Sequence, residues 1–303
     1  MDKLQWLKER QKGIGGSDVV AILGLSRWKT AFQIYLDKTG EITEDTVSSE
    51  NVYFGHALED LVAREFTNRT GKRVRRDNKQ LSHKNYPFII ANIDRRVIGE
   101  NAILECITAS SFSGSEWEED QVSTSHLLKC QHYLAVTGAE KCYIAVLIDG
   151  QKFLWKEILR DEGLIDMVIQ CEKDFWENHV EKRIPPPIDG SEAADKYLKN
   201  RYAKVKAGVQ VELEADYKEI IINYLIIKES IKTMEEELKA IENNIKNTLG
   251  EADGGTVGNY LVKWKAIISS RVDSKKLKER YPEVYKEVCK EGISRKFEIK
   301  EVI

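Results

Sequence analysis

The sequence predicts a mixed α/β protein that continues into a long helix and a small second α/β segment. Three observations lead to this prediction. Strand-like stretches alternate with helical ones in the first part of the chain, three consecutive prolines follow at 185–187, and a 3.5-residue apolar repeat occupies 217–245. We therefore expect a domain over residues 1–188 and an extension over 189–303, whose long helix covers about 212–249.

The composition excludes several classes of protein. At 42% hydrophobic and 32% charged residues, the chain suits a globular protein with a real core. It has no run near the roughly 18 apolar residues of a membrane helix and no secretory signal, so we expect a cytoplasmic protein without a membrane partner. Five cysteines without a C-x-x-C pair indicate neither disulfides nor zinc. The net charge of -3 gives no global attraction to nucleic acid, and the basic run 72–76 is usually a solvated face.

Helical patterns open the chain. Residues 1–40 look helical, with a break and a new helix start at 15–18, because Ser17 and Asp18 are good capping residues. Leucine, valine and phenylalanine recur at helical spacing over 55–70, and Gly71 supplies a stop. Glu59 lies at the edge of this apolar stripe.

Three strand-like segments follow, at 73–82, 88–97 and 102–110. Gly99 and Glu100 form a plausible two-residue hairpin loop. In that register Asp94 faces Glu105, with Cβ atoms about 4.5–5.5 Å apart. Two carboxylates so close can share one cation. The alternative, which the spacing leaves open, is that one or both point outward to arginines such as Arg95 or Arg96.

Further elements complete the pattern. An amphipathic helix over 123–138 precedes a hairpin that turns at Asp149–Gly150, and a helix over about 162–181 leads to the prolines. The apolar seam of 217–245 then needs a partner, either another copy or a helix of the same chain, of which the second is the simpler expectation. The remaining extension reads as a strand, a helix and a last strand, ending in SRKFEIK.

Five segments, taken in order, resemble a known family. They are WLKERQKGIGGSDVVAILGLSRWKT, FGHALEDLVAREF, ANIDRR, LECITAS and KCQHYLAVTG. They are similar to the YqaJ-like phage recombinase nucleases, relatives of phage lambda exonuclease in the restriction-endonuclease-like PD-(D/E)xK superfamily. The resemblance covers roughly residues 4–185. It implies a restriction-endonuclease-like mixed central sheet flanked by helices.

The resemblance also implies a metal site. By position, Asp94 and Glu105 would bind the metal, with the backbone carbonyl of Cys106 beside them and Glu59 in support. Phosphodiester hydrolysis needs an activated water and stabilisation of negative charge, and Mg²⁺ held by hard oxygen ligands supplies both. We expect Mg²⁺ as the cofactor, with Mn²⁺ as a substitute.

Three more positions match the family. Arg10 and Ser17 fall where it binds the terminal phosphate, and an arginine can grip a phosphate bidentately. Gln131 matches the glutamine of the helix that packs over the active site, and we count it among the catalytic residues.

The chain departs from the motif at Ile107, where the family has a lysine. Three explanations compete. The role of the lysine could have moved to Lys129, the substitution could be deliberate, or the protein could be a natural binder without activity. A lysine on the helix near Gln131 could reach the site, which favours the first.

These expectations give a first hypothesis: a phage or prophage exonuclease that resects linear double-stranded DNA, 5′ to 3′, in the cytoplasm of a bacterial host. The resemblance implies a single-strand annealing protein as its partner and a ring-like trimer as its assembly. The second hypothesis is a catalytically silent module that binds DNA ends or proteins on a nuclease fold.

Overall fold

The computed structural model describes residues 10–41, 50–110, 117, 122–204, 208–289 and 295–301. The chain forms two compact units, Met1–Ala203 and Lys204–Ile303. This division lies after the boundary expected at residue 188, because α7 (Glu192–Arg201) belongs to the first unit. Tyr197 of α7 is buried, and its ring meets Phe32 edge-on at 5.3 Å.

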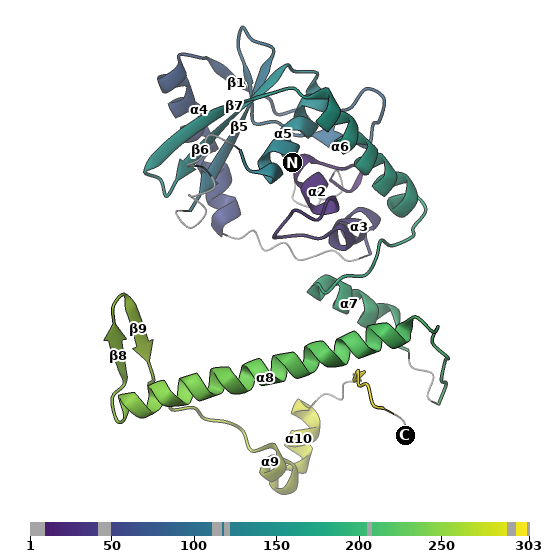
Figure 1. Cartoon of the computed structure of the whole chain (residues 1–303), viewed down its shortest axis with the longest axis vertical. Helices are drawn as coiled ribbons and strands as arrows, with labels where there is room; N and C mark the ends of the chain where they lie inside the picture. The colour runs from purple at the N-terminus through teal and green to yellow at the C-terminus, as the bar shows by residue number, and fades with distance from the viewer. Residues whose placement is uncertain are drawn as a thin grey trace. The chain divides into compact units, whose positions relative to one another are not determined.

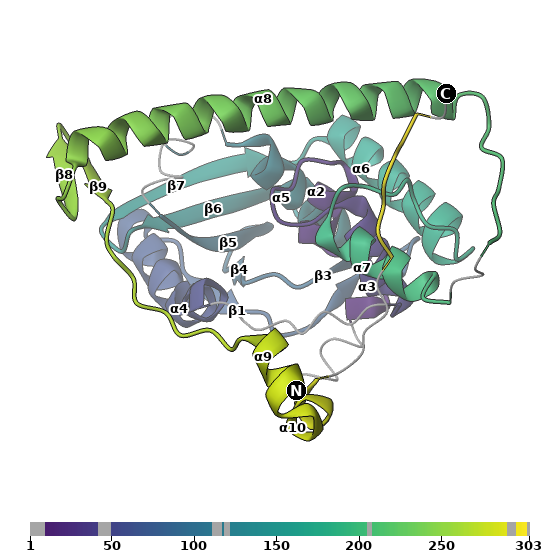
Figure 2. The ribbon, with the colours of Figure 1, turned by 90° about the horizontal axis from the view of Figure 1, so that it is seen from below.

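The first unit is built on a five-stranded mixed sheet in the order β1-β4-β5-β6-β7, which Figure 2 shows. Neighbouring strands are antiparallel except β5 and β6, which are parallel because helix α5 crosses between them. Its strands are β1 (Val74–Arg76), β4 (Arg95–Val97), β5 (Ala102–Ala109), β6 (Lys141–Ile148) and β7 (Lys152–Leu159). A short antiparallel pair, β2 (Leu81–Ser82) and β3 (Ile90–Ala91), lies outside this sheet.

Helices cover both faces of the sheet (Figure 1). On one face α5 (Thr124–Thr137) packs Cys130 and Leu134 against Ile103, and on the other α4 (Glu50–Thr70) packs Phe66 against Leu104. Because side chains alternate along a strand, residues 103, 105 and 107 of β5 point toward α5. The remaining helices of this unit are α2 (Gly16–Ile22), α3 (Ala31–Thr39), α6 (Glu162–Phe175) and the π-helical turn η2 (Trp176–Val180).

The N-terminal helices follow the expected helix start at 15–18, but a second break separates α2 from α3. Residues 1–9 of the expected helical stretch lie outside the described part. Gly15 is the N-cap of α2, and the Asp18 side chain accepts a hydrogen bond from its backbone N–H at 3.0 Å. Thr30 caps α3 reciprocally: its backbone N–H donates to the Gln33 side chain at 2.9 Å, and its hydroxyl accepts from the Gln33 N–H at 3.2 Å. The residues between Ile22 and Ala31 are not helical. The two caps therefore begin two short helices.

The predicted strands are shorter than the sequence indicates. The stretch 73–82 contributes β1 and then β2, while 88–97 contributes β3 and then β4. The chain bends at Asp94, directly before β4. This bend separates β3, which pairs with β2, from β4, which joins the main sheet. The strand-like pattern of 88–97 does not indicate the bend.

The second unit contains the long helix α8 (Tyr217–Leu249), the hairpin β8 (Gly254–Val257) and β9 (Tyr260–Lys263), then α9 (Ser274–Arg280) and α10 (Pro282–Val288). The one helix expected over 274–290 is two, because Pro282 lacks the N–H that would continue α9. The last expected strand is wrong for its described part, since 295–301 has no strand. None of the described helices is long and apolar enough to cross a membrane.

Candidate active site

Asp94 and Glu105 lie side by side at the junction of β4 and β5. The two strands pair Arg95 with Leu104 and Arg96 with Ile103, the register expected from the turn at Gly99. One residue further on, Asp94 therefore comes opposite Glu105. A carboxylate oxygen of Asp94 accepts a hydrogen bond from the backbone N–H of Cys106 at 2.8 Å. This bond fixes the aspartate against β5.

The two acids interact strongly. Glu105 is only 5% exposed and Asp94 is half-buried. Burial, followed by the negative charge of Glu105, raises the pKa of Asp94 to about 8, although the Cys106 N–H opposes the rise. A pair of acids that resists full ionisation in this way has the charge and the hard oxygen atoms that suit a divalent cation.

Lys129 brings a cation to the same place. It projects from α5, and its ammonium donates a hydrogen bond to the Glu105 carboxylate. Burial alone would lower the pKa of Lys129, but the charge of Glu105 outweighs it and holds that pKa well above the ordinary value. The Tyr133 ring, one helical turn on, lies 5.6 Å from the ammonium. Two acids and one lysine thus share the sheet face that α5 covers.

Gly16 allows α2 to approach this cluster. A Cβ atom at Gly16 would lie 2.8 Å from the Tyr133 ring and 3.0 Å from Cγ of Lys129. Both distances are shorter than ordinary van der Waals contact, so any side chain here would force the helices apart. Gly16 therefore has a packing role at the edge of the candidate site.

Glu59 does not join the two acids directly. Its carboxylate pairs with the Arg95 guanidinium, which also donates to the backbone carbonyl of Asp94 at 2.6 Å and to Asp60 at 2.6 Å. Arg95 is 3% exposed and points toward the α4 side of the sheet, as its pairing with Leu104 requires. Glu59 thus supports Asp94 through an arginine rather than as a neighbour in one carboxylate cluster.

The ligand set implied by the resemblance is only partly assembled. Among the described residues, no group of three or more His, Cys, Asp or Glu side chains converges on one metal position. Asp94 and Glu105 do fit a hard divalent cation, because they are two adjacent oxygen donors whose mutual repulsion on ionisation such a cation would offset. The Cys106 side chain packs among apolar residues on the α4 face. Burial, followed by the charge of Asp94, raises the pKa of its thiol, so only the backbone of Cys106 suits the site.

Ile107 lies two residues beyond Glu105 on the same face of β5. It is half-buried against the apolar core beneath α5 and pairs with Val146 of β6. The position of the motif lysine is therefore adjacent to the site but part of the core, and it contributes no charge.

Gln131 is not brought to the acids. Its amide donates to the Leu159 carbonyl at 2.7 Å and accepts from the Asp161 N–H at 3.1 Å, at the end of β7. Two residues along a helix rotate a side chain by about 200°, so Gln131 cannot point where Lys129 points. Its side chain, 1% exposed, ties α5 to the end of the sheet.

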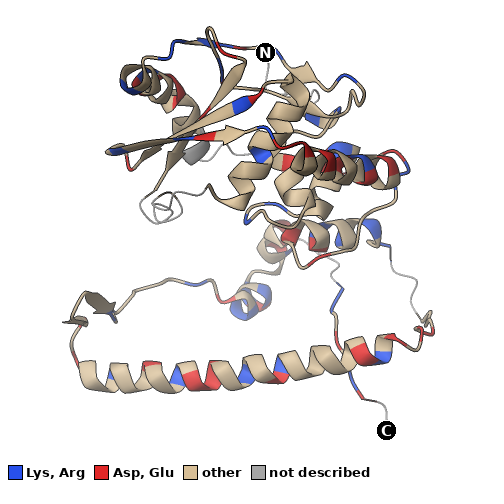
Figure 3. Cartoon of the chain, turned by 45° about the horizontal axis from the view of Figure 1, so that its top comes forward, with Lys and Arg blue, Asp and Glu red and all other residues tan. Residues whose placement is uncertain are grey.

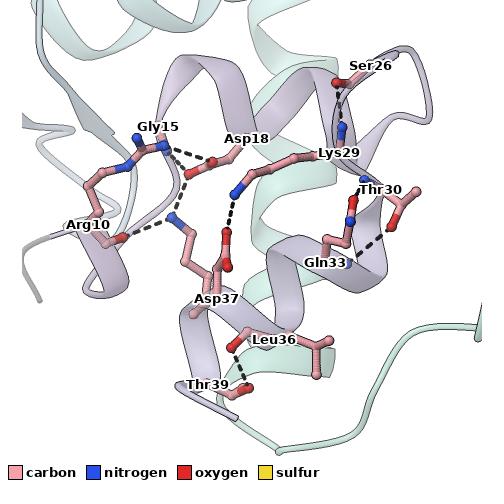
Figure 4. Close-up of polar contacts among 11 residues, drawn as sticks. Arg10, Gly15, Asp18, Ser26, Lys29, Thr30, Gln33, Leu36, Asp37 and Thr39 are labelled. Carbon is pink, nitrogen blue, oxygen red and sulfur yellow. Dashed lines mark hydrogen bonds and ion pairs between the residues drawn. The ribbon is translucent and has the colours of Figure 1, made fainter. Parts of the chain in front are cut away.

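A second polar cluster surrounds Arg10 (Figure 4). Asp18, on α2, pairs with the Arg10 guanidinium at 3.5 Å and with the Lys38 ammonium at 2.6 Å. Lys38 also donates to the Arg10 backbone carbonyl at 2.9 Å. Burial opposes ionisation of Asp18, yet the charges of Lys38 and Arg10 hold its pKa below the usual value.

Asp18 and Lys38 fix Arg10 from the buried side, while part of the Arg10 side chain faces solvent. The Asp18 and Lys38 side chains are 5% and 3% exposed, whereas that of Arg10 is 40% exposed. Ser17, in the first turn of α2, is also exposed. Sequence reasoning identified Arg10 and Ser17 but missed Lys38. The signal available was a lysine in the last turn of a largely apolar helix, which is common and carries little information.

Solved structures share the fold of the first unit. An alkaline exonuclease, LHK-Exo, from Laribacter hongkongensis matches with a TM-score of 0.52 and 16% identity, over 66% of this chain and 98% of that chain. The same exonuclease in complex with dAMP matches with a TM-score of 0.52 and 18% identity, over the same shares of both chains. The five-stranded mixed sheet and its flanking helices thus define a protein with an exonuclease fold.

Sequence relatives narrow this class. Residues 5–140 match the YqaJ-like viral recombinase domain. The chain is 49% identical over 304 residues to the uncharacterised protein YqaJ of Bacillus subtilis (strain 168), covering 100% of this chain and 95% of that protein. The chain belongs to the YqaJ-like viral recombinase family, as its five motif segments indicate.

Proposed function

We propose that this protein is a metal-dependent exonuclease that acts on the ends of linear double-stranded DNA. One observation carries the proposal: Asp94 and Glu105 lie together on the α5 side of the sheet, with the Lys129 ammonium on Glu105. Two acids supply the hard oxygen ligands of a hydrolytic metal ion, and a lysine can neutralise charge that develops on a phosphate. Membership of the viral recombinase family and the exonuclease fold support the same reaction class.

Asp94 and Glu105 would hold the metal, Mg²⁺ or Mn²⁺, with the Cys106 carbonyl as a third oxygen donor. When bound, the dication would activate a water molecule and offset the negative charge that grows on the phosphate. Glu59 would act at one remove, because its carboxylate fixes Arg95 and Arg95 binds the Asp94 carbonyl. The protein's contribution is thus to keep two acids adjacent that would otherwise repel each other.

Lys129 would take the role of the missing motif lysine. Its ammonium already lies at the Glu105 carboxylate, where it can shift to a substrate phosphate when a metal ion takes the acid. Ile107 can neither donate a hydrogen bond nor neutralise charge. Of the three explanations for Ile107, the position of Lys129 favours the first, in which the role of the motif lysine has moved from the strand to helix α5.

Arg10 and Ser17 would bind the 5′-phosphate of the strand to be degraded. The buried pair of Asp18 and Lys38 supports this role because it fixes the backbone and guanidinium of Arg10. Digestion from 5′ to 3′, transfer of the 3′ strand to an annealing protein, a ring-like trimer and action in the bacterial cytoplasm are the parts of the proposal that rest on the family resemblance.

A second candidate function follows from Ile107 alone. An apolar residue at the motif position favours a module that binds DNA ends without cleaving them. The two candidates differ in a simple way. The nuclease releases nucleotides with metal present, whereas the binding module retains the end intact and gains cleavage only when Ile107→Lys restores the motif.

The test uses linear duplex DNA with 5′-phosphates, Mg²⁺, and acid-soluble nucleotides as the readout. Asp94→Asn and Glu105→Gln keep the shape of each side chain and should abolish release. Glu157→Gln, an exposed acid of β7, is the matched control and should leave it unchanged. Release that survives both active-site changes would end the assignment. Calorimetric titration with Mn²⁺ in the absence of DNA separates loss of metal binding from loss of DNA binding.

A further inference from the structure

Helix α8 has an apolar seam that the active site does not explain. The helix is 33 residues long and has no buried residue. Nine of its apolar residues follow alternating steps of three and four, and each of these nine is 36–67% exposed. The seam consists of Tyr217, Ile220, Tyr224, Ile227, Ile231, Met234, Leu238, Ile241 and Ile245. Four heptads of this pattern are typical of a helix that pairs with another helix.

We propose that the α8 seam pairs with the α8 seam of a second copy of this chain, in antiparallel orientation. The pairing would place Ile231 of one copy opposite Met234 of the other. It does not depend on the proposed nuclease function. It also departs from the simpler expectation of packing within the chain.

The sizes of the seam residues favour this orientation. The tyrosines stand at one end of the seam, and smaller residues stand at the other. Antiparallel pairing places Tyr217 opposite Thr248 and Tyr224 opposite Ile241, so each large side chain meets a smaller one. Parallel pairing in register would instead place each tyrosine against its own copy. Facing layers interdigitate better when large and small residues alternate across them.

The charges beside the seam favour the same orientation. Figure 3 shows charges of both signs along α8. Antiparallel pairing brings Lys228 beside Glu235 of the second copy, and symmetry makes this contact twice. Parallel pairing brings Glu237 beside Glu242 of the second copy, again twice. Opposite charges flanking a seam stabilise a helix pair and like charges oppose it, so only the antiparallel arrangement is free of repulsion at these positions.

Within the second unit, the described residues leave the seam open. The ring of Phe297, from the C-terminal segment, meets Tyr224 at 5.8 Å. The other seam residues remain exposed along a helix about 50 Å long. A second α8 of equal length matches this seam from end to end, which a short segment such as 295–301 cannot do.

Sedimentation velocity of the full chain over a range of concentrations tests the proposal. The wild type should double its mass reversibly, from monomer to dimer or from the proposed trimer to a hexamer, and Ile231→Asp should abolish this doubling. Lys228→Glu and Glu235→Lys should each weaken it about tenfold or less, and the double variant Lys228→Glu/Glu235→Lys should restore it. Lys239→Glu, on the outer face of the helix, is the matched control and should have no effect. Circular dichroism verifies that each variant remains helical.

Three outcomes would overturn the proposal. A wild type that shows no doubling of mass at about 100 μM does not form the seam contact. If Ile231→Asp leaves the doubling unchanged, the doubling uses another surface. If Glu237→Lys strengthens the association, and the double variant Lys228→Glu/Glu235→Lys does not restore it, the helices pair in parallel. Each of these results leaves the nuclease assay unaffected, so failure here is distinguishable from failure of the proposed function.

Discussion

Lys129 of α5 donates a hydrogen bond to Glu105 of β5, so a helix supplies the cation that faces a buried acid of the sheet. Glu105 in turn lies across the strand pair from Asp94. The cluster thus combines one group from the helix with two from the hairpin. Ile107, at the position of the motif lysine, packs in the core nearby.

Replacement of Lys129 should remove most of the nuclease activity. Lys129→Ala takes away the cation beside Glu105, and loss of one charge-stabilising donor typically costs about 100-fold or more in kcat. Single-turnover digestion of 5′-phosphorylated duplex measures the effect. Lys129→Arg keeps the charge and should retain part of the activity. Full activity in Lys129→Ala would show that the lysine is structural, and recovery in Ile107→Lys/Lys129→Ala would show that strand and helix positions are equivalent.

Asp18→Asn should both destabilise the first unit and loosen Arg10. It leaves the buried Lys38 ammonium without its carboxylate, and breaking a buried ion pair from one side costs about 3–5 kcal/mol. Urea unfolding measures the free energy of unfolding. The rate ratio for 5′-phosphorylated against 5′-hydroxyl ends should also fall.

Asp18→Asn/Lys38→Met serves as the control for this cluster, because it removes both charges and should recover part of the stability. Arg10→Ala should lose the preference for phosphorylated ends without the large loss of stability. An unchanged end preference in Arg10→Ala would remove Arg10 from the phosphate site.

Gln131→Ala should lower stability rather than catalysis. Its amide makes two hydrogen bonds to backbone groups at the end of β7, and leaving such buried groups unsatisfied costs about 1–3 kcal/mol. Thermal unfolding should shift downward, while kcat at a temperature well below the transition should stay near the wild-type value. A large fall in kcat of the folded variant would return Gln131 to the active site.

The buried pair of His132 and Glu172 should make stability depend on pH. Both imidazole nitrogens face acceptors, the Glu172 carboxylate at 2.6 Å and the Ile90 carbonyl at 2.9 Å, so the ring is doubly protonated. Burial alone would lower the pKa of His132, but the charge of Glu172 raises it above 6.5. The pair's contribution is therefore fully present below pH 6.5 and is lost as the pH rises through the raised pKa.

Urea unfolding at a series of pH values checks this dependence. The free energy of unfolding of the wild type should fall as the pH rises through the raised pKa of His132. His132→Gln/Glu172→Gln removes the imidazole and its partner carboxylate and should flatten that part of the curve. An equally steep fall in the double variant would assign the pH dependence to other groups.

The hairpin at the centre of the site could be predicted from sequence, because its register follows from local rules. Gly99 allows a tight turn with a positive φ of 87°, and the alternation of apolar residues sets which face each strand presents. Together these place Asp94 opposite Glu105 before any tertiary contact is known. The seam of α8 was predictable for the same reason, since its repeat lies within one helix.

The rest of the site depends on how separate elements pack. Glu59 meets Arg95 only because α4 covers the sheet face to which Arg95 points, and no local pattern specifies that face. Gln131 was placed in the site by motif matching, although it lies on another side of α5 from Lys129. Lys38 reaches Asp18 from a different helix, a contact that spacing along the chain cannot indicate.

The division of the cluster between hairpin and helix has a consequence during synthesis of the protein. Where a motif lysine follows the second acid on the same strand, all three groups emerge together from the ribosome. Here the ammonium arrives from a helix that begins at Thr124. A nascent chain can therefore form the hairpin before α5 docks, so the two acids meet their lysine only in the finished domain.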